Sequence, residues 1–208
     1  MKLIVGLGNP GRIYAESRHN IGFSVIKALS RIYKVSLKKD TLSLSGKGRV
    51  GHENLILALP LTFMNLSGIA VSALTKKYKI DLENLLVVCD DLDLGFGAIK
   101  IRPNGSSGGH RGLGSTIDSL GSQKFSRLHI GIGRPLHNNI DVAGFVLSPF
   151  TKKEKEKNKE IIEQACCCCR TWVRKGITES MNIFNGTGKY KTLSHTTETS
   201  QRKVLKSR

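Results

Sequence analysis

A continuous apolar run, Leu85 to Cys89, leads directly into the acidic sequence Asp90-Asp91-Leu92-Asp93. A run without polar residues is typical of a central strand that is covered on both faces, as in a parallel sheet between two layers of helices. In open α/β sheets, the carboxyl ends of such strands carry the ligand-binding loops. The sequence therefore predicts an α/β fold with a site where this strand ends.

Further strands and helices alternate along the chain. Apolar runs predict strands at 3–5, 54–59, 98–102 and 127–132, and helical spacing predicts helices at 20–34, 67–78, 112–120 and beyond Pro149. We expect Ser67 to cap its helix and Pro60 to break the strand before it. The alternation predicts a single-domain, three-layer α/β sandwich: a mixed, mainly parallel twisted sheet flanked by helices.

The chain is strongly basic. Its 208 residues include 33 Lys and Arg against 16 Asp and Glu, a formal net charge of +17. Such a charge indicates a polyanionic partner. Nucleic acid is the first candidate, and an acidic membrane surface is the second. Residues 187–208 hold six basic residues and one acidic residue with scarcely any apolar content, which predicts a basic, disordered tail. A charge of +12 remains on residues 1–186, which are predicted to form the folded domain.

Targeting signals and a disulfide framework are not expected. No run approaches the roughly 20 apolar residues of a membrane span, and the opening apolar run meets Gly6 too early for a signal peptide. The five cysteines are Cys89 and the consecutive Cys166 to Cys169, which is no spaced disulfide pattern. We expect a soluble cytoplasmic protein whose four adjacent cysteines pack in a helix as small hydrophobes.

The first predicted strand ends in Gly6-Leu7-Gly8-Asn9-Pro10-Gly11, which satisfies the dinucleotide-binding pattern G-x-G-x-x-G. Two requirements of that pattern fail. No acidic residue lies between Glu16 and Asp40 to bind a ribose, and residues 12–18 separate the glycines from the next helix. A nicotinamide or flavin site is therefore disfavoured.

His19 precedes the first predicted helix, close to the turn of the first strand. If Asp90 accepts a hydrogen bond from one ring nitrogen of His19, it fixes the tautomer and raises the basicity of the other nitrogen. The pair would then take a proton from water. Asn9, Asn20, Asn65 and backbone N–H groups of the glycine turns are available to hold substrate or an oxyanion.

Two alternatives compete with this hypothesis. Asp90, Asp91 and Asp93 could bind a divalent cation and support phosphoryl chemistry, although no firm metal-binding spacing is present. A serine nucleophile is poorly supported, because Ser67 and Ser115 lie where helices begin and no G-x-S-x-G elbow occurs.

The sequence resembles the bacterial type of peptidyl-tRNA hydrolase, with its motifs in collinear order over residues 1–186. The motifs that carry the resemblance are Gly6-Leu7-Gly8-Asn9-Pro10-Gly11, Tyr14 with Arg18-His19-Asn20-Ile21-Gly22, Pro60-Leu61-Thr62-Phe63-Met64-Asn65-Leu66-Ser67-Gly68, Asp90-Asp91-Leu92-Asp93-Leu94, Gly109-His110-Arg111-Gly112-Leu113 and Ile130-Gly131-Ile132-Gly133-Arg134-Pro135. Each motif alone is weak, and together they are highly specific.

The resemblance implies a monomeric cytoplasmic hydrolase that cleaves the ester between a peptide and the 3′ ribose of tRNA, with no metal or cofactor and with neither DNA nor a membrane as partner. It makes His19 the catalytic base and Asp90 the carboxylate that orients it. The implied contacts to the peptide and terminal nucleotide are Asn9, Tyr14, Met64 and Asn65, and those to tRNA phosphates are Lys100 and Arg102, with Arg127 and Arg134 as further candidates.

One position departs from the family pattern. The family usually has Asn directly after the His of its G-G-H-N-G motif, and here that residue is Arg111. Arginine accepts no hydrogen bond, but it can donate to a carbonyl, an oxyanion or a phosphate. We keep Arg111 among the substrate-binding residues and expect activity, because His19 and Asp90 are retained. The competing interpretation is an RNA-binding protein whose chemistry is weakened by Arg111.

Overall fold

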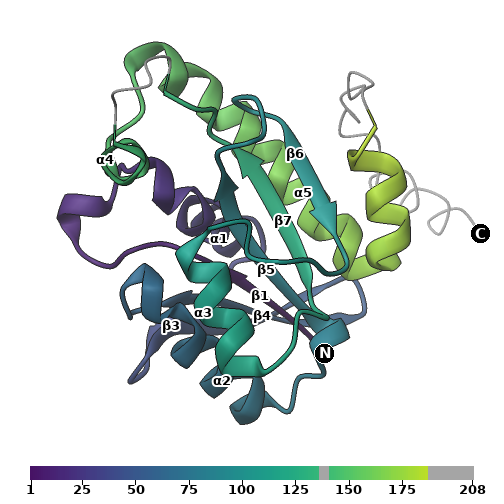
Figure 1. Ribbon diagram of the computed structural model, residues 1–208. Coiled ribbons are helices and arrows are strands. Elements are labelled where there is room, and N and C mark those ends of the chain that lie inside the picture. The colour runs from purple at the N-terminus through teal and green to yellow at the C-terminus, as the bar shows by residue number, and fades with distance from the viewer. Residues whose placement is uncertain (136–140, 187–208) are drawn as a thin grey trace, which may run out of the picture.

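The computed structural model describes residues 1–135 and 141–186 and contains one seven-stranded sheet (Figure 1). The predicted basic tail, 187–208, lies outside the described residues. The strand order is β2-β3-β4-β1-β5-β7-β6. The strands are β1 (Lys2–Gly6), β2 (Lys38–Lys39), β3 (Ser43–Val50), β4 (Glu53–Pro60), β5 (Leu85–Asp91), β6 (Ile99–Arg102) and β7 (Ser126–Gly131).

Helices and short 3-10 turns connect the strands. The helices are α1 (Ile21–Ile32), α2 (Ser67–Tyr78), α3 (Arg111–Leu120), α4 (Val142–Leu147) and α5 (Lys152–Phe184), and the 3-10 turns are η1 (Arg12–Tyr14), η2 (Arg18–Asn20), η3 (Met64–Leu66) and η4 (Leu82–Asn84). In the part of the chain that the structure describes, no helix could cross a membrane.

The sheet is mixed, as predicted. The four central strands β4, β1, β5 and β7 run parallel, whereas β2, β3 and β6 are antiparallel to their neighbours. The chain crosses from β1 to β4 on one side and then returns past β1 to β5 on the other. The strand order therefore reverses between β1 and β5, which is where open α/β sheets bind their ligands.

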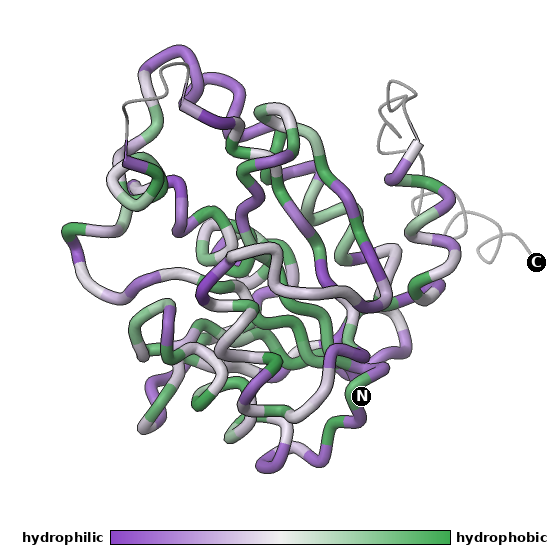
Figure 2. The backbone as a smooth tube through the Cα atoms, in the orientation of Figure 1, coloured by the Kyte–Doolittle hydropathy of each residue, from purple (hydrophilic) through white to green (hydrophobic). Residues whose placement is uncertain are grey.

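Apolar side chains of the central strands feed two separate core layers. Ile4 and Leu86 belong to the layer that α1 and α5 cover, and Leu3, Val5 and Val87 belong to the layer beneath α2 and α3. Figure 2 shows hydrophobic residues concentrated along these inner strands. The prediction that the run at 85–89 is covered on both faces is confirmed, because all five of its residues are buried.

Close approach of backbone to backbone fixes where α1 begins. A Cβ atom on Gly22, in the first turn of α1, would lie 2.5 Å from the carbonyl oxygen of Val88 and 2.6 Å from that of Leu7. A Cβ on Gly6 would lie 2.2 Å from the carbonyl oxygen of Gly22. Because both residues lack a side chain, the start of α1 lies directly against the ends of β1 and β5.

Several sequence predictions need correction. Strand β3 was not predicted, since its Ser- and Gly-rich sequence has little strand propensity, and it forms by pairing with β4 along its whole length. Pro60 is the last paired residue of β4, so the strand includes the proline instead of ending before it. Ser67 caps nothing, because α2 begins at this residue and its Oγ is buried 4.0 Å from Met64 Sδ.

Three of the four adjacent cysteines pack into the core, in accord with the predicted role. Cys166, Cys168 and Cys169 lie on the buried face of α5, whereas Cys167 is exposed. Burial raises the pKa of Cys166 to about 12 and raises that of Cys168 further. The buried thiols therefore stay protonated and behave as apolar side chains.

The end of α5 returns to the edge of the sheet. The helix kinks at Gly176, whose φ is 81°, and Asn185 follows its last turn. The Asn185 amide accepts from the N–H of Ile101 and donates to its carbonyl oxygen, both at 2.8 Å. Ile101 lies in β6, the outer strand of the sheet, so one side chain pairs with this edge as a strand would.

We expect Gly22→Ala to destabilise the protein by about 3 kcal/mol, the upper part of the range for overpacking, because both neighbouring atoms belong to backbone. Gly114→Ala, inside α3, is the matched control, because its Cβ would meet Ser107 of the preceding loop at 3.8 Å, an ordinary van der Waals contact. That change should stabilise by up to about 1 kcal/mol. Urea unfolding of both variants measures the difference, and equal midpoints would contradict the packing argument.

Candidate active site

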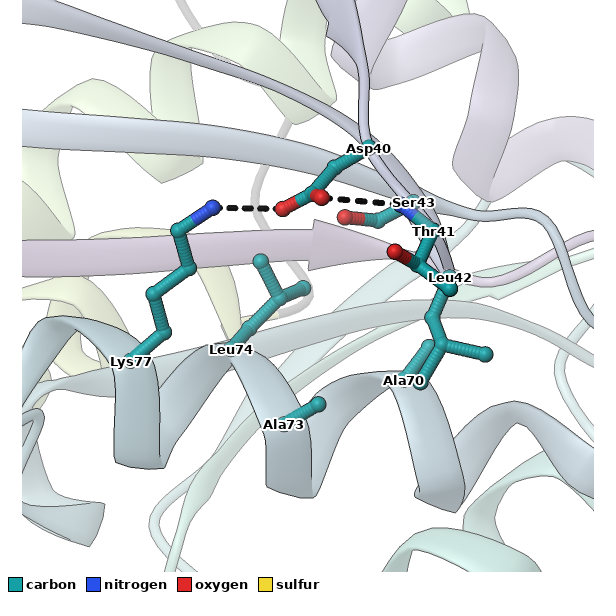
Figure 3. Close-up of a pocket in the computed structure, with 8 residues that line it drawn as sticks. All are labelled: Asp40, Thr41, Leu42, Ser43, Ala70, Ala73, Leu74 and Lys77. Carbon is teal, nitrogen blue, oxygen red and sulfur yellow. Dashed lines mark hydrogen bonds and ion pairs between the residues drawn. The ribbon is translucent and has the colours of Figure 1, made fainter.

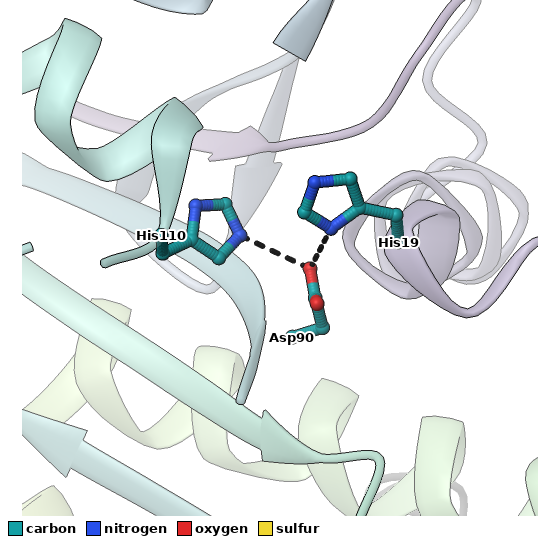
Figure 4. Close-up of side chains that lie close together, drawn as sticks. All are labelled: His19, Asp90 and His110. Carbon is teal, nitrogen blue, oxygen red and sulfur yellow. Dashed lines mark hydrogen bonds and ion pairs between the residues drawn. The ribbon is translucent and has the colours of Figure 1, made fainter. Parts of the chain in front are cut away.

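Three side chains meet at the carboxyl edge of the sheet, near the reversal of strand order (Figure 4). Asp90 is the penultimate residue of the buried strand β5, His19 is in η2 immediately before α1, and His110 caps the start of α3. His19 and Asp90 are 71 residues apart in the sequence. The structure therefore brings together the pair that the sequence predicts, and it adds a second imidazole.

Both imidazoles contact the same oxygen of Asp90. His19 Nδ1 lies 2.7 Å and His110 Nε2 lies 3.0 Å from Asp90 Oδ1. The ring centroids of the two histidines are 5.0 Å apart. Asp90 is 3% exposed and His19 is 9% exposed, so these bonds lie where little water competes with them.

Hydrogen bonding determines the position of each ring proton. His110 Nδ1 accepts from the backbone N–H groups of Gly112 and Leu113 at 3.1 and 3.2 Å. A ring nitrogen that accepts carries no proton, so the proton of His110 is on Nε2 and is donated to Asp90. Because the ionised carboxylate only accepts, His19 must donate through Nδ1. The lone pair of His19 is therefore on Nε2, which has no partner among the described residues.

The charge state of Asp90 follows from the same contacts. Burial by itself raises the pKa of a carboxyl group, but His110 and His19 lower the pKa of Asp90 well below its usual value, because their hydrogen bonds and charge favour the ionised form. Asp90 thus remains a carboxylate throughout the pH range in which imidazoles titrate.

The three aspartates of the acidic motif do not converge. Asp91 Oδ2 lies 3.0 Å from His129 Nδ1, and Asp91 Oδ1 accepts from the N–H groups of Asp93 and Leu94. Asp93 is exposed and forms an ion pair with Arg134. The metal site suggested by Asp90, Asp91 and Asp93 is therefore not formed.

Among residues 1–135 and 141–186, the set of donors close enough to hold a metal ion is His19, Asp90 and His110. The protonation pattern does not fit that use. A neutral imidazole that ligates through Nε2 carries its proton on Nδ1, whereas His110 Nδ1 accepts two backbone hydrogen bonds. The hydrogen bonds of this cluster fix the ring protons of the two histidines, and they do not suit the binding of a metal ion.

Arg18 anchors the turn that carries His19. Its guanidinium donates to the carbonyl oxygen of Pro149 at 2.5 Å, to Ser148 Oγ at 2.7 Å and to Glu154 Oε2 at 2.7 Å. It also lies over the ring of Phe145, with 4.5 Å between Cζ and the ring centroid. These contacts hold η2 against α4 and the beginning of α5.

Asn9 and Asn20 join the loops around the site. Both polar atoms of the Asn20 amide bind the backbone of Asn9, at 2.7 Å to its N–H and 2.9 Å to its carbonyl oxygen. Asn20 is thus used internally and is not available to an oxyanion, contrary to the sequence-based expectation. Asn9 Oδ1 accepts from the N–H of Met64 at 2.7 Å. Asn9 Nδ2 has no partner in the described part of the chain.

The remaining predicted pocket residues lie on adjoining turns. Met64 is buried, and its sulfur occupies the space that a Cβ on Gly112 would fill. Asn65 is the exposed middle residue of η3, and Arg111 is the exposed first residue of α3. Tyr14 is half-buried at the end of η1, where its carbonyl oxygen accepts from Ser17 Oγ.

The predicted phosphate-binding residues differ in exposure. Arg102 is exposed and Lys100 half-buried on β6, and Arg134 is exposed beside Asp93, with 2.9 Å between Arg134 Nε and Asp93 Oδ1. Arg127 is fully buried, and its guanidinium donates to backbone carbonyl oxygens. It has no surface with which to grip a phosphate, so that prediction is wrong.

A shallow pocket elsewhere has no comparable chemistry. It lies between α2 and the connection from β2 to β3, and the ion pair of Lys77 Nζ with Asp40 Oδ2, at 2.5 Å, crosses it (Figure 3). The rest of its lining is small or apolar, including Ala70, Ala73 and Leu74. None of the residues that line it belongs to the cluster of His19, Asp90 and His110.

His110 was not predicted to belong to the site. Its signal was present: a histidine follows Gly108 and Gly109 and stands directly before a predicted helix, the position from which a side chain caps N–H groups. What the sequence does not contain is the direction of the other ring nitrogen, which depends on α3 lying beside β5.

The fold and the buried histidine–aspartate pair place the protein in the class of α/β enzymes with a site at the carboxyl edge of the sheet. The family model described as "Peptidyl-tRNA hydrolase" matches residues 3–193. Peptidyl-tRNA hydrolases of Syntrophomonas wolfei and Bacillus anthracis are each 46% identical over 186 residues, which is 89% of this chain and all of theirs. The chain belongs to the peptidyl-tRNA hydrolase family.

Solved structures agree with this assignment. The peptidyl-tRNA hydrolase from Acinetobacter baumannii superposes with a TM-score of 0.82 at 36% identity, covering 88% of this chain and 93% of that one. Its Arg119Gln mutant gives a TM-score of 0.84 at 37% identity, covering 89% and 95%. The predicted α/β fold is confirmed.

We expect Asn9→Ala to cost about 1–3 kcal/mol of stability, because the buried N–H of Met64 would lose its acceptor. The comparison variant is Asn65→Ala in η3, next to Met64, whose exposed side chain should change the stability by no more than about 0.5 kcal/mol. Thermal and urea unfolding would measure both values. Equal losses in the two variants would show that the bond from Met64 to Asn9 does not stabilise η3.

Proposed function

We propose that the protein hydrolyses the ester bond between a peptide and the 3′ ribose of tRNA, as a cytoplasmic monomer acting on peptidyl-tRNA rather than on DNA or a membrane. The observation that carries this proposal is the state of His19: its Nδ1 donates to an ionised Asp90, and its Nε2 holds a lone pair that no described residue uses. Membership of the family supports the choice of substrate.

In the proposed reaction, His19 Nε2 removes a proton from water as the water oxygen attacks the ester carbonyl carbon. The tetrahedral intermediate then expels the 3′ oxygen of the ribose, which receives the proton back from the imidazolium. Asp90 orients the ring and stabilises the imidazolium, as the aspartate of a catalytic triad does. The products are a peptide with a free carboxyl group and a tRNA with a free 3′ hydroxyl, and no metal or cofactor takes part.

Polar side chains around the imidazole would hold the peptide end. The exposed amide of Asn65 can both donate and accept, and Asn9 can donate through Nδ2 because its Oδ1 already accepts from Met64, so both suit a peptide backbone whatever its side chains. Met64 and Tyr14 would contribute apolar and aromatic surface to the terminal nucleotide. Arg111, exposed at the first turn of α3, would donate to a carbonyl oxygen or a phosphate.

Basic side chains on the outer strand would hold the tRNA. Lys100 and Arg102 lie on β6 and are paired in register with His129 and Arg127 of β7, two strands from Asp90. With Arg134 they would place positive charge beside the site, where the phosphates of an acceptor stem arrive.

We expect His19→Ala to lower the rate of ester cleavage by at least about 10²–10⁴-fold, the usual contribution of a general base. Asp90→Asn should lower kcat more than it raises KM, because an amide can donate to Nδ1 and so permits the tautomer whose lone pair faces away from substrate. Asp118→Asn, an exposed carboxylate of α3, is the matched control and should retain full activity.

The assay uses an N-blocked aminoacyl-tRNA in the presence of EDTA. Cleavage that persists in EDTA and disappears in His19→Ala is the expected result. Tight tRNA binding without release of the acyl group would favour an RNA-binding protein, and turnover that requires added metal would overturn the proposed mechanism. Because its contacts hold the pKa of Asp90 well below the usual value, titration of this carboxylate should not contribute to any loss of rate between about pH 8 and pH 5.

We expect Lys100→Gln and Arg102→Gln each to reduce the slope of log K against log salt for tRNA binding by about 0.7–0.9, the release of one counterion per lost contact. Lys76→Gln, an exposed lysine of α2, should leave the slope unchanged. Binding titrations between low and moderate salt provide the slopes. If all three variants gave the wild-type slope, β6 would not contact phosphates.

A further inference from the structure

Arg127 is the largest charged side chain that the fold buries completely. It lies in β7 with 0% of its surface exposed, and no carboxylate pairs with it among the described residues. Burying a charge without an opposite charge is expensive, and burial lowers the pKa of this guanidinium below its usual value. Other interactions must therefore offset the cost of burying this guanidinium.

Its partners are three carbonyl oxygens of the backbone. Arg127 Nη1 donates to Gly105 at 2.5 Å and to Ser106 at 3.1 Å, and Nη2 donates to Gln123 at 2.8 Å. The guanidinium also lies over the ring of Phe125, with 4.4 Å between Cζ and the ring centroid. Two of the three bonds thus reach one segment, the loop 103–109 between β6 and α3.

That loop has little else to hold it. Gly105, Gly108 and Gly109 have φ values of 149°, 55° and 79°, conformations that cost glycine little and that an unrestrained loop would exchange freely. A Cβ on Gly108 or Gly109 would meet nothing within 4 Å, whereas one on Gly105 would lie 3.7 Å from Arg127 Nη1. The inner side of the loop therefore rests on the guanidinium.

The loop ends at a residue of the active site. The N–H of His110 donates to the carbonyl oxygen of Ser107 at 2.9 Å, and His110 Nε2 donates to Asp90 at 3.0 Å. An error of about 1 Å in the position of a catalytic group can reduce the rate about 10²-fold. Whatever fixes residues 105–107 consequently fixes the second donor to the Asp90 carboxylate.

We propose that Arg127 is a positioning residue: its buried guanidinium ties the glycine-rich loop 103–109 to β7 and so holds His110 against Asp90. This role rests on the proposed function for its effect on rate, but its effect on the loop is independent of activity. It also explains why an arginine is used, since the planar fork of donors reaches three carbonyl oxygens at once.

The test compares Arg127→Met, which keeps the packing on Phe125, with Arg127→Lys, which keeps the charge and some donors. In Arg127→Met we expect kcat to fall by about 10–10²-fold with little change in KM, and Arg127→Lys should recover part of the loss. The slope of log K against log salt for tRNA binding should stay at the wild-type value in both. Arg49→Met, an exposed arginine of β3, is the control with unchanged activity.

Two measurements report on the order of the loop and on the His110–Asp90 hydrogen bond without any substrate. Hydrogen exchange of the amides at 105–109 should accelerate in Arg127→Met, and the ring N–H proton of His110, seen by NMR when it is hydrogen-bonded to Asp90, should broaden or disappear. If Arg127→Met does not fold, Arg127→Lys should still show both effects to a smaller degree.

The outcomes separate the two proposals. A wild-type protein that cleaves no ester refutes the proposed function, while the exchange and NMR data still decide the role of Arg127. A folded Arg127→Met variant with wild-type exchange and an intact His110 signal overturns the positioning role. Wild-type kcat together with a reduced salt slope would overturn it as well, and would make Arg127 a phosphate ligand after all.

Discussion

One carboxylate oxygen organises the site. Asp90 Oδ1 accepts from His19 and from His110, which arrive from elements on different sides of β5. Each bond determines a ring proton, and each ring proton determines what the other nitrogen of that ring can do: His110 caps a helix, and His19 offers a lone pair. The neighbouring structure, from the glycine contacts at the start of α1 to the cap of α3, serves to bring these two rings to the same oxygen.

The pair His19–Asp90 could be predicted because each residue adjoins an element that the sequence shows clearly. Asp90 follows an apolar run, and His19 stands before a helix whose start is fixed by contacts with β1. His110 could not be predicted in its role, since that depends on how α3 lies on the sheet. The prediction that Arg127 binds phosphate was wrong for a related reason. A strand pattern indicates which side chains point to each face of the sheet, but not that a loop covers one of them.

Positive charge in this protein therefore serves two purposes. Arg18 and Arg127 are buried, and each binds backbone carbonyl oxygens that fix a loop beside a histidine of the site. Arg102, Arg111 and Arg134 are exposed and can meet a polyanion, Arg134 by exchanging its ion pair with Asp93 for a phosphate. The net charge of the sequence adds both groups together, so it overstates the charge available for binding and conceals the structural use of the guanidinium.

The two outer strands of the sheet are protected against strand addition in different ways, and this protection matters in a crowded cell. An unpaired outer strand is a template on which a second chain can add and begin to aggregate. At one end β2 is two residues long, and both are lysines. At the other end the Asn185 amide occupies the donor and the acceptor of Ile101. A single side chain after the last helix thus protects a basic edge against strand addition while leaving the neighbouring Arg102 exposed.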